Sequence, residues 1–332
     1  MIKGRRVQAS LNEGTVGMSL TIDGLRKRFG EVQALDGVSF QVRPGEVFGF
    51  LGANGAGKTT TMRIVLGFLR PDDGTVTWNQ LPAASWPRRI WGYMPEERGL
   101  YLRMPVLDQL VYFASLYGVP RATARRDAIQ WLARFRIEDY ADRKAESLSK
   151  GNQQKVQYIA TILHDPDVIL MDEPFSGLDP VNVALLKSAF LEMRERGKTV
   201  IFSTHQLDQA EELCDSVAII DRGRIVTTGT TREVKRSTGH QVVRVATAHD
   251  GDIRWLQSLP HVTVTRPGHD YTEVRVESGS DPQAVLRAAM SHGGDVLRFE
   301  VADPSLEEVF VTRVGALDTH ERTLAAVAEA VE

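Results

Sequence analysis

The sequence predicts an α/β fold with a parallel sheet, followed by a smaller α+β domain. Short apolar runs bounded by Gly, Pro and Asp alternate with amphipathic helical stretches, which favours an α/β domain. Two runs, residues 47–51 and 168–171, are apolar at successive positions, the pattern of strands that are buried on both faces of a parallel sheet. A third strand of this type is expected at residues 199–203.

A helical insertion is predicted between about residues 105 and 165. Apolar residues recur there at helical spacing, first at Val106, Leu110, Phe113 and Tyr117 and then at Ile129, Leu132 and Phe135. A further helix is expected after Asp179 and Pro180, because Asp is a favourable N-cap residue and Pro a favourable first helical residue.

The pattern changes again after about residue 237. Strands are expected at residues 241–246, 261–266, 271–277 and 295–301, and helices at 253–259 and 282–290. The order strand, helix, strand, strand, helix, strand is that of a small ferredoxin-like domain. We therefore divide the chain into a flexible extension (1–17), a first domain (18–237), an α+β accessory domain (238–315) and a tail (316–332).

Composition narrows the class of partner. The formal net charge of the 332 residues is only −3, so no basic excess exists to bind a nucleic-acid backbone, and we expect no nucleic-acid partner. No run of eighteen apolar residues is present, so any membrane role is expected to come through another polypeptide. The lone cysteine, Cys214, cannot form an internal disulfide, which fits a reducing cytoplasm, and we interpret it as a buried packing residue.

Residues 52–59, Gly-Ala-Asn-Gly-Ala-Gly-Lys-Thr, match the phosphate-binding loop pattern and directly follow the first predicted strand. The glycines allow backbone N–H groups to turn toward the phosphates, and the helix that should follow adds partial positive charge. Lys58 would reach the β- and γ-phosphates, and the Thr59 hydroxyl would hold Mg²⁺. This loop predicts binding of a nucleoside triphosphate but does not separate a kinase, a GTPase and a motor.

A pair of carboxylates ends the second predicted strand. Asp172 would organise Mg²⁺ at the carboxyl end of the sheet, where α/β folds place their ligands. Glu173 beside it would accept a proton from the attacking water as general base.

A second possible anion site precedes this strand. Residues 148–153, Leu-Ser-Lys-Gly-Asn-Gln, contain a Ser-x-Gly turn at the predicted start of a helix. One small nucleotide does not need two such sites so far apart in sequence. The two sites are explained together if this turn serves a nucleotide that is held by a second copy of the chain.

These motifs, in this order, resemble those of the nucleotide-binding subunits of ABC transporters. Residues 52–59 match the Walker A motif, 168–173 Walker B, 148–153 the family signature and 176–179 (Ser-Gly-Leu-Asp) the D-loop, and His205 matches the switch histidine. The resemblance covers about residues 19–235. It implies an ABC ATPase domain of the P-loop NTPase class, with ATP and Mg²⁺ as cofactors.

The resemblance also implies roles for individual residues. Glu173, His205 and Lys58 would be catalytic, and Thr59, Glu96 and Asp172 would hold the metal. Phe29 would lie against adenine, while Ser149, Gly151 and Asp179 would contact the nucleotide or the partner across a head-to-tail dimer. The full expected nucleotide-binding set is Phe29, Gly52, Asn54, Gly55, Ala56, Gly57, Lys58, Thr59, Thr60, Glu96, Ser149, Lys150, Gly151, Asn152 and Asp179.

Two motifs depart from the family pattern. The signature normally reads Ser-Gly-Gly-Gln, whereas this chain has Lys150 and Asn152 within it, and the Q-loop glutamine is replaced by Glu96. With the small C-terminal domain, these departures resemble exporter-type ATPases associated with sodium or drug efflux.

The resemblance implies a homodimer of ATPase subunits that acts with a separate multi-helix membrane permease at the cytoplasmic face of the membrane. Two alternatives stay open. A non-transport ABC ATPase acting on nucleic acid, ribosomes or cluster assembly would share the motifs, although this chain has one motif set and no long coiled coil. A P-loop kinase would share the phosphate loop but does not explain the turn at Ser149.

Overall fold

The computed structural model describes residues 19–314 except 98, 249–253, 269 and 293–294, so the predicted extension and tail lie outside the described residues. Its central sheet has six strands in the order β10-β9-β3-β8-β7-β6. Neighbouring strands from β9 to β6 are parallel, and β10 pairs antiparallel with β9. The bounds are β3 (Val47–Leu51), β6 (Trp91–Met94), β7 (Val168–Asp172), β8 (Thr199–Thr204), β9 (Ser216–Asp221) and β10 (Arg224–Thr230).

The three strands predicted from apolar runs are confirmed. Every residue of β3, β7 and β8 is buried, as expected for strands covered on both faces. The parallel order brings the carboxyl ends of β3, β7 and β8 to one edge of the sheet, next to the phosphate loop. The fold therefore brings together motifs that are more than a hundred residues apart in sequence.

A second, antiparallel sheet was not assigned from the sequence. Its order is β2-β1-β4-β5, from β1 (Leu20–Phe29), β2 (Val32–Val42), β4 (Asp73–Trp78) and β5 (Leu81–Pro82). The register of β1 against β2 shifts at three points along the strands, which interrupts the strict alternation of apolar and polar residues. The buried side chains of this sheet pack against α1 (Lys58–Val65) and one face of the central sheet.

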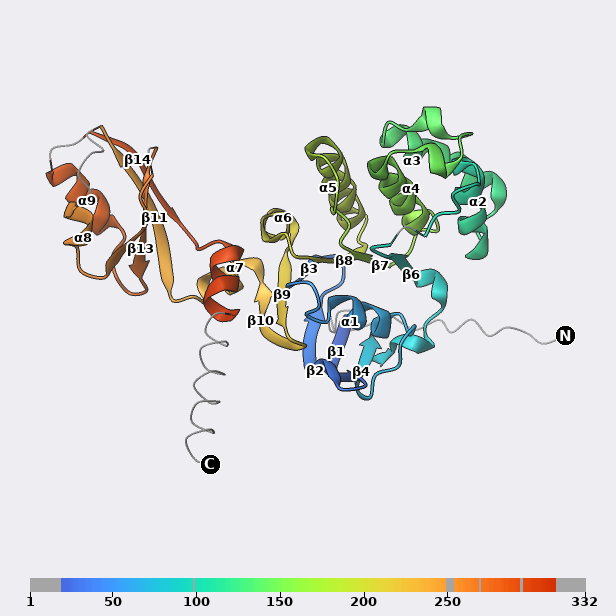
Figure 1. Cartoon of the computed structure of the whole chain (residues 1–332), viewed down its shortest axis with the longest axis horizontal. Coiled ribbons are helices and arrows are strands. Elements are labelled where there is room, and N and C mark those ends of the chain that lie inside the picture. The colour runs from blue at the N-terminus through green and yellow to red at the C-terminus, as the bar shows by residue number, and fades with distance from the viewer. Residues whose placement is uncertain (1–18, 98, 249–253, 269, 293–294, 315–332) are drawn as a thin grey trace, which may run out of the picture.

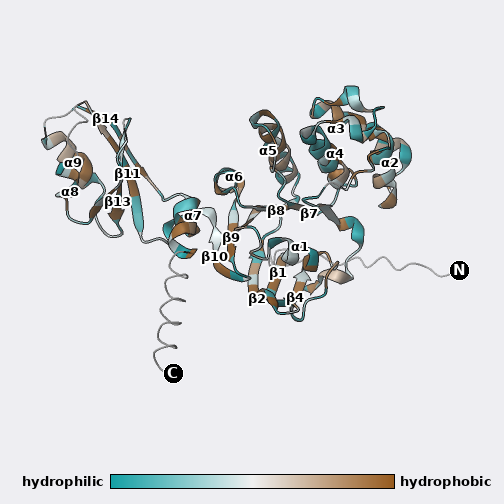
Figure 2. Ribbon diagram, in the orientation of Figure 1, coloured by the Kyte–Doolittle hydropathy of each residue, from teal (hydrophilic) through white to brown (hydrophobic). Residues whose placement is uncertain are grey.

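The predicted insertion is helical, as Figure 1 shows to one side of the central sheet: α2 (Val106–Leu116), α3 (Arg121–Arg134) and α4 (Lys150–Ile162). On the same face of the sheet lie α5 (Pro180–Glu195) and α6 (Leu207–Leu213), and α7 (Thr231–Arg236) follows β10. Figure 2 shows α5 mostly in hydrophobic colours and α3 largely in hydrophilic ones, which agrees with the more central position of α5. No helix within the described ranges is both long and apolar enough to cross a membrane.

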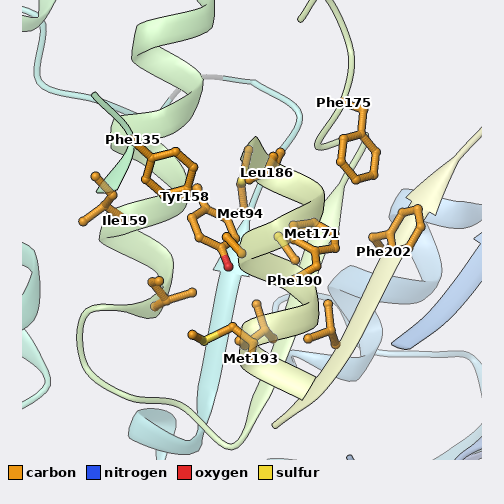
Figure 3. Close-up of a cluster of buried hydrophobic side chains, with 14 of the residues drawn as sticks. Met94, Phe135, Tyr158, Ile159, Met171, Phe175, Leu186, Phe190, Met193 and Phe202 are labelled. Atoms are coloured by element: carbon orange, nitrogen blue, oxygen red, sulfur yellow. The ribbon is translucent and has the colours of Figure 1, made fainter. Parts of the chain in front are cut away.

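Aromatic packing joins the insertion to the central sheet (Figure 3). The buried Tyr158 of α4 contacts Phe135 at 5.5 Å and stacks on Phe190 of α5 at 5.8 Å between ring centroids. Phe190 in turn meets Phe202 of β8 at 5.6 Å. This chain of rings connects α4, which begins at the signature, with the strand that precedes His205.

The accessory domain has the predicted ferredoxin-like topology. Its strands are β11 (His240–Thr247), β12 (Val262–Arg266), β13 (Thr272–Glu277) and β14 (Val296–Ala302), in the antiparallel order β12-β13-β11-β14. Its helices are α8 (Arg254–Gln257) and α9 (Gln283–Ser291). Residue 253, at which the first of these helices was expected to start, lies outside the described part.

A C-terminal helix (residues 306–314) returns to the first domain and was not predicted. Its Leu306 and Val309 are wholly buried in the same hydrophobic cluster as Leu213 of α6 and Val234 of α7. The Glu211 carboxylate of α6 accepts a hydrogen bond from the Leu306 backbone N–H at 2.9 Å and one from Lys235 Nζ at 2.5 Å. The chain therefore leaves the accessory domain to complete the core of the first domain.

Replacing Leu306 with alanine is expected to lower the free energy of unfolding by about 2–5 kcal/mol, because a fully buried leucine leaves a cavity when it is truncated. Chemical denaturation measures this change. Val311→Ala on the same helix is the control, since that side chain is 64% exposed and its loss should change stability by about 0.5 kcal/mol or less. Equal effects of the two substitutions would show that the helix does not pack on the first domain in solution.

Cys214 at the end of α6 is buried, as predicted, and it belongs to the hydrophobic cluster that contains Leu306 and Val309. Burial raises the pKa of its thiol well above the ordinary value, so the neutral form is favoured. A buried neutral thiol is a packing residue rather than a nucleophile.

Candidate functional site

The phosphate loop (residues 52–59) connects β3 to α1 by a turn that requires glycine. A Cβ atom on Gly52 would lie 2.3 Å from the Ile220 carbonyl oxygen. Gly57, the N-cap of α1, has φ +112°, and its Cβ would lie 2.8 Å from the Ala34 carbonyl oxygen. The loop can therefore approach its neighbours, and a bound phosphate, as closely as only glycine allows.

A pocket of about 330 Å³ opens above this loop. It gathers residues from the loop, the start of α1, the loop after β6 and the end of β7, and its described lining is Ala34, Asn54, Gly55, Gly57, Lys58, Thr59, Thr60, Glu96, Asp172 and Glu173. All of these except Ala34 were predicted as site residues from the sequence. Gly52 and Ala56, also predicted, are buried parts of the loop and are not among the described lining residues, and Ala56 packs in the core beside the second sheet.

Lys58 is folded inward and only 6% exposed. Its Nζ donates hydrogen bonds to the Gly52 carbonyl at 2.6 Å and the Ala53 carbonyl at 3.1 Å. It also lies 3.4 Å from Oε1 of Glu173. A phosphate entering the pocket would exchange these partners for its own oxygens, and charge-assisted bonds to phosphate are stronger than bonds to neutral carbonyls.

Glu173 and His205 contact each other directly. Oε2 of Glu173 lies 3.0 Å from Nδ1 of His205, and the Glu173 side chain is almost fully buried whereas the His205 side chain is 46% exposed. Oε1 of Glu173 has no hydrogen-bond partner. Glu173 is thus a buried carboxylate at the pocket wall whose Oε1 makes no hydrogen bond but is paired with Lys58 Nζ, a position that suits a general base.

Asp172 at the end of β7 is 1% exposed. Its Oδ1 accepts a hydrogen bond from the Ser203 hydroxyl, while its Oδ2 is buried without a partner. No group of three or more His, Cys, Asp or Glu side chains among the described residues could hold a metal ion alone. Mg²⁺ usually takes one or two protein carboxylates together with substrate phosphates and water, so the orphan Oδ2 fits such an ion when it arrives with a nucleotide.

Glu96 lies in the loop after β6 and lines the pocket. The loop is held by Gln157 of α4, whose Nε2 donates to the Pro95 carbonyl at 2.8 Å and the Glu97 carbonyl at 3.2 Å. Another buried glutamine of α4, Gln154, donates to the Pro174 carbonyl at 3.0 Å. The helix that begins at Ser149 therefore supports segments on both sides of the carboxylate pair, a role that the sequence interpretation did not assign.

The remaining predicted residues form a separate group at the starts of α4 and α5. Ser149 is the N-cap of α4, and its Oγ accepts the Asn152 N–H at 3.3 Å. Asp179 is the N-cap of α5, as predicted, and the hydrogen bonds that it accepts from Asn182 hold the pKa of its carboxyl below the ordinary value. A Cβ on Gly151 would lie 3.2 Å from Nδ2 of Asn182, so the two helix starts are adjacent. None of this group is among the described lining residues of the phosphate-loop pocket.

Phe29 ends β1 and is 48% exposed. It pairs across the hairpin with Val32, which is also exposed, and Lys27 Nζ lies 5.6 Å from its ring centroid. Phe29 is not among the described pocket-lining residues, so its contact with adenine stays a prediction. An exposed aromatic ring at a hairpin tip is available for stacking.

The sequence is similar to those of known proteins along most of its length. It is 42% identical over 298 residues to the uncharacterized ABC transporter ATP-binding protein YhaQ of Bacillus subtilis, an alignment that covers 90% of this chain and 99% of the relative. The chain belongs to the ABC transporter ATP-binding proteins. Members of this family bind ATP and are ATPases that drive transport, so the chain is an ABC ATPase.

Two family models match this ABC ATPase. The ABC transporter model matches residues 35–176, and the model described as ATP-binding protein DrrA1-3-like, C-terminal domain, matches residues 229–314. The second match includes the C-terminal helix with the accessory domain. The predicted fold class, an ABC ATPase domain with a small α+β domain, is thereby confirmed.

Further relatives carry the word export in their names. The chain is 34% identical over 308 residues to Nod factor export ATP-binding protein I of Ralstonia nicotianae, covering 89% of this chain and 94% of that relative. It is 33% identical over 316 residues to a fluoroquinolones export ATP-binding protein of Mycobacterium tuberculosis, covering 93% and 97%. A solved ATP-binding subunit of an ABC transporter superposes with a TM-score of 0.62 at 33% identity, covering 66% of this chain and 93% of that structure.

Proposed function

We propose that this ABC ATPase powers the export of a substrate through a separate membrane permease, by ATP-driven head-to-tail dimerisation. The export direction is supported by relatives named for Nod factor and fluoroquinolone export and by the DrrA-like C-terminal domain. The permease is supported by the family, whose members drive transport, together with the finding that no described helix could cross a membrane. The permease would recruit the ATPase to the membrane surface.

Within one subunit, the pocket would bind the triphosphate of ATP through the phosphate loop and Lys58. Thr59 and Asp172, with Glu96 nearby, would hold Mg²⁺, which when bound would neutralise charge on the β- and γ-phosphates. Glu173 would accept the proton of the attacking water, and His205 would donate to the γ-phosphate region while its Nδ1 contact keeps Glu173 oriented.

One observation carries the dimer: the Ser149 turn is a helix start that lies apart from the phosphate-loop pocket of its own chain. A helix N-terminus with free backbone N–H groups binds anions. The Ser149 turn, however, is not among the described residues that line the pocket of Lys58 in the same subunit, so it would not contact a phosphate bound there. A second subunit related by a two-fold axis would bring its Ser149 turn onto the γ-phosphate, and the isologous arrangement would repeat at both sites. ATP would then be bound by both subunits at once.

The two departures from the family pattern act at this proposed interface. Lys150 is exposed at the first position of α4 and would add positive charge next to the phosphate of the partner subunit. Glu96 replaces an amide with an acceptor-only carboxylate at the pocket wall. We propose that both change how tightly ATP closure is coupled to the permease.

Ser149→Arg is expected to prevent the ATP-bound dimer without unfolding the monomer, because Ser149 is exposed and the larger cation would occupy the space of the partner's phosphate. The measurement is the molar mass of the Glu173→Gln protein with Mg²⁺-ATP, with and without Ser149→Arg, by light scattering. Ser258→Arg makes the same change at an exposed serine of the accessory domain and should leave the dimer intact. Dimers that persist with Ser149→Arg would contradict the proposed interface.

Purification of the tagged protein from membranes under mild detergent tests the permease. A co-purifying polypeptide with several membrane-spanning helices, present in stoichiometric amount, is the expected result. Recovery of the ATPase only from the water-soluble fraction, with ribosomal or nucleic-acid components attached, would instead favour a non-transport ABC ATPase.

A further inference from the structure

Ser203 is hydrogen-bonded to both residues of the carboxylate pair, Asp172 and Glu173, although the sequence motifs gave it no role. It is wholly buried near the end of β8, and in the parallel register its backbone is the partner of Asp172 on β7. Thirty-one residues separate Ser203 from Asp172 in sequence, and the sheet alone brings them together.

The Ser203 hydroxyl uses both of its hydrogen-bonding capacities on the carboxylate segment. It donates to Oδ1 of Asp172 and accepts the backbone N–H of Glu173 at 3.1 Å. A hydroxyl has a single hydrogen to donate, so Ser203 can donate to only one of the two oxygens of Asp172. The occupied oxygen is Oδ1, and Oδ2 is left without a partner at the pocket.

The second contact holds an unusual backbone. Glu173 has φ +49°, in the left-handed region that is costly for a residue with a Cβ atom. Its N–H is shared between the Ser203 hydroxyl and the Ser203 carbonyl, the latter at 3.2 Å. Both acceptors therefore belong to one residue, and that residue sets the direction in which the Glu173 side chain leaves the strand end.

We propose that Ser203 is a positioning residue of the ATPase reaction, whose hydroxyl holds the Asp172 carboxylate and the Glu173 backbone in the arrangement that Mg²⁺-ATP requires. This inference rests on the proposed roles of Asp172 and Glu173. Ser203 itself is fully buried and is not among the described residues that line the pocket, so it would act through the two acids rather than by contact with the nucleotide or the metal.

A matched hydrogen bond exists elsewhere in the same sheet. Ser216 at the start of β9 is buried and donates to Oε2 of Glu46 at 2.9 Å. This is again a buried serine on a carboxylate, but at the opposite end of the strands from the pocket. Loss of the two hydroxyls should have similar effects on stability, so Ser216→Ala separates a general structural effect from a positioning effect.

The test compares Ser203→Ala, Ser203→Thr and Ser216→Ala in the full-length chain. Ser203→Ala is expected to lower the rate of ATP hydrolysis roughly ten- to a hundredfold, the range for losing a hydrogen bond to a charged group. It should also weaken binding of Mn²⁺, used as a spectroscopic probe for Mg²⁺, to the protein–ATP complex by about tenfold. ATP affinity measured without divalent metal should change less than about threefold, because Lys58 and the phosphate loop are untouched.

Ser203→Thr retains the hydroxyl and is expected to restore most of the Mn²⁺ affinity. Ser216→Ala should shift the melting temperature about as much as Ser203→Ala while leaving Mn²⁺ binding and hydrolysis within about threefold of wild type. If Ser203→Ala does not fold, Ser203→Cys, which keeps the side-chain size but is a weak donor, provides the same comparison.

The inference about Ser203 would be wrong if folded Ser203→Ala keeps wild-type Mn²⁺ affinity and hydrolysis while Glu173→Gln is inactive. The proposed function would still stand after that result. Equal losses in Ser203→Ala and Ser216→Ala would also overturn it, since both would then reflect stability. A wild-type chain that neither binds nor hydrolyses ATP would overturn the proposed function, and the Ser203 inference with it.

Discussion

Replacing Glu173 with glutamine is expected to lower the rate of ATP hydrolysis by about a hundred- to ten-thousandfold, the usual contribution of a general base. Glutamine has nearly the same shape, so the contact with His205 can persist, but an amide cannot accept a proton from water. ATP binding should be retained because the phosphate loop is unchanged. Single-turnover hydrolysis and ATP affinity, measured on the same preparation, separate the two effects.

Closed dimers should therefore accumulate in the Glu173→Gln protein when Mg²⁺-ATP is present. Glu146→Gln is a suitable control, because Glu146 is an exposed glutamate three residues before the Ser149 turn and should retain wild-type hydrolysis. Normal turnover by Glu173→Gln would show that another group takes the proton, and the assignment of the base would be wrong.

Replacing Lys58 with alanine is expected to reduce ATP affinity by at least roughly a hundredfold. Among the described residues lining the pocket, Lys58 is the one that carries a cationic side chain. Each charge-assisted hydrogen bond to phosphate contributes about 1.5–3 kcal/mol, so losing two of them corresponds to roughly a hundredfold or more. Titration calorimetry with ATP measures the change directly.

The same substitution has a second expected effect, on the ATP-free protein. It removes the cation 3.4 Å from the buried Glu173, so the melting temperature should fall, because a buried carboxylate is then less well compensated. Lys187→Ala, which breaks an ion pair with Glu212 on α5 and α6, is the control and should leave ATP affinity unchanged. Unchanged ATP affinity in Lys58→Ala would mean that the phosphates bind elsewhere.

Local patterns were sufficient for the elements that surround the phosphate-loop pocket. Continuous apolar runs predicted β3, β7 and β8, because strands covered on both faces need apolar residues on both sides. The Asp179–Pro180 pair predicted the start of α5 because capping is decided by residues adjacent in sequence. The residues of the phosphate loop that line the pocket could be named for the same reason, since this loop is a local structure.

Features that depend on distant contacts could not be predicted in this way. The antiparallel sheet β2-β1-β4-β5 was missed, because shifts in register between β1 and β2 interrupt the alternation of apolar and polar residues. Ser203 and Gln157 carry no local signal of their role, which arises only when β8 and α4 pack beside the ends of β7 and β6. The ion pair between Lys58 and Glu173 could not be predicted either, because the two residues are more than a hundred positions apart in sequence.

The return of the C-terminal helix means that the accessory domain is inserted into the ATPase body rather than appended to it. Arg236 after β10 pairs with Asp303 at 3.0 Å, and Arg313 donates to the Ser237 carbonyl at 2.8 Å, so the outgoing and returning segments are fastened side by side. Cutting the gene short after residue 237 would therefore strip Leu306 and Val309 from the core and leave an apolar hollow next to α6. A stable minimal ATPase would instead require excising the four-stranded sheet and joining the two fastened segments with a short loop.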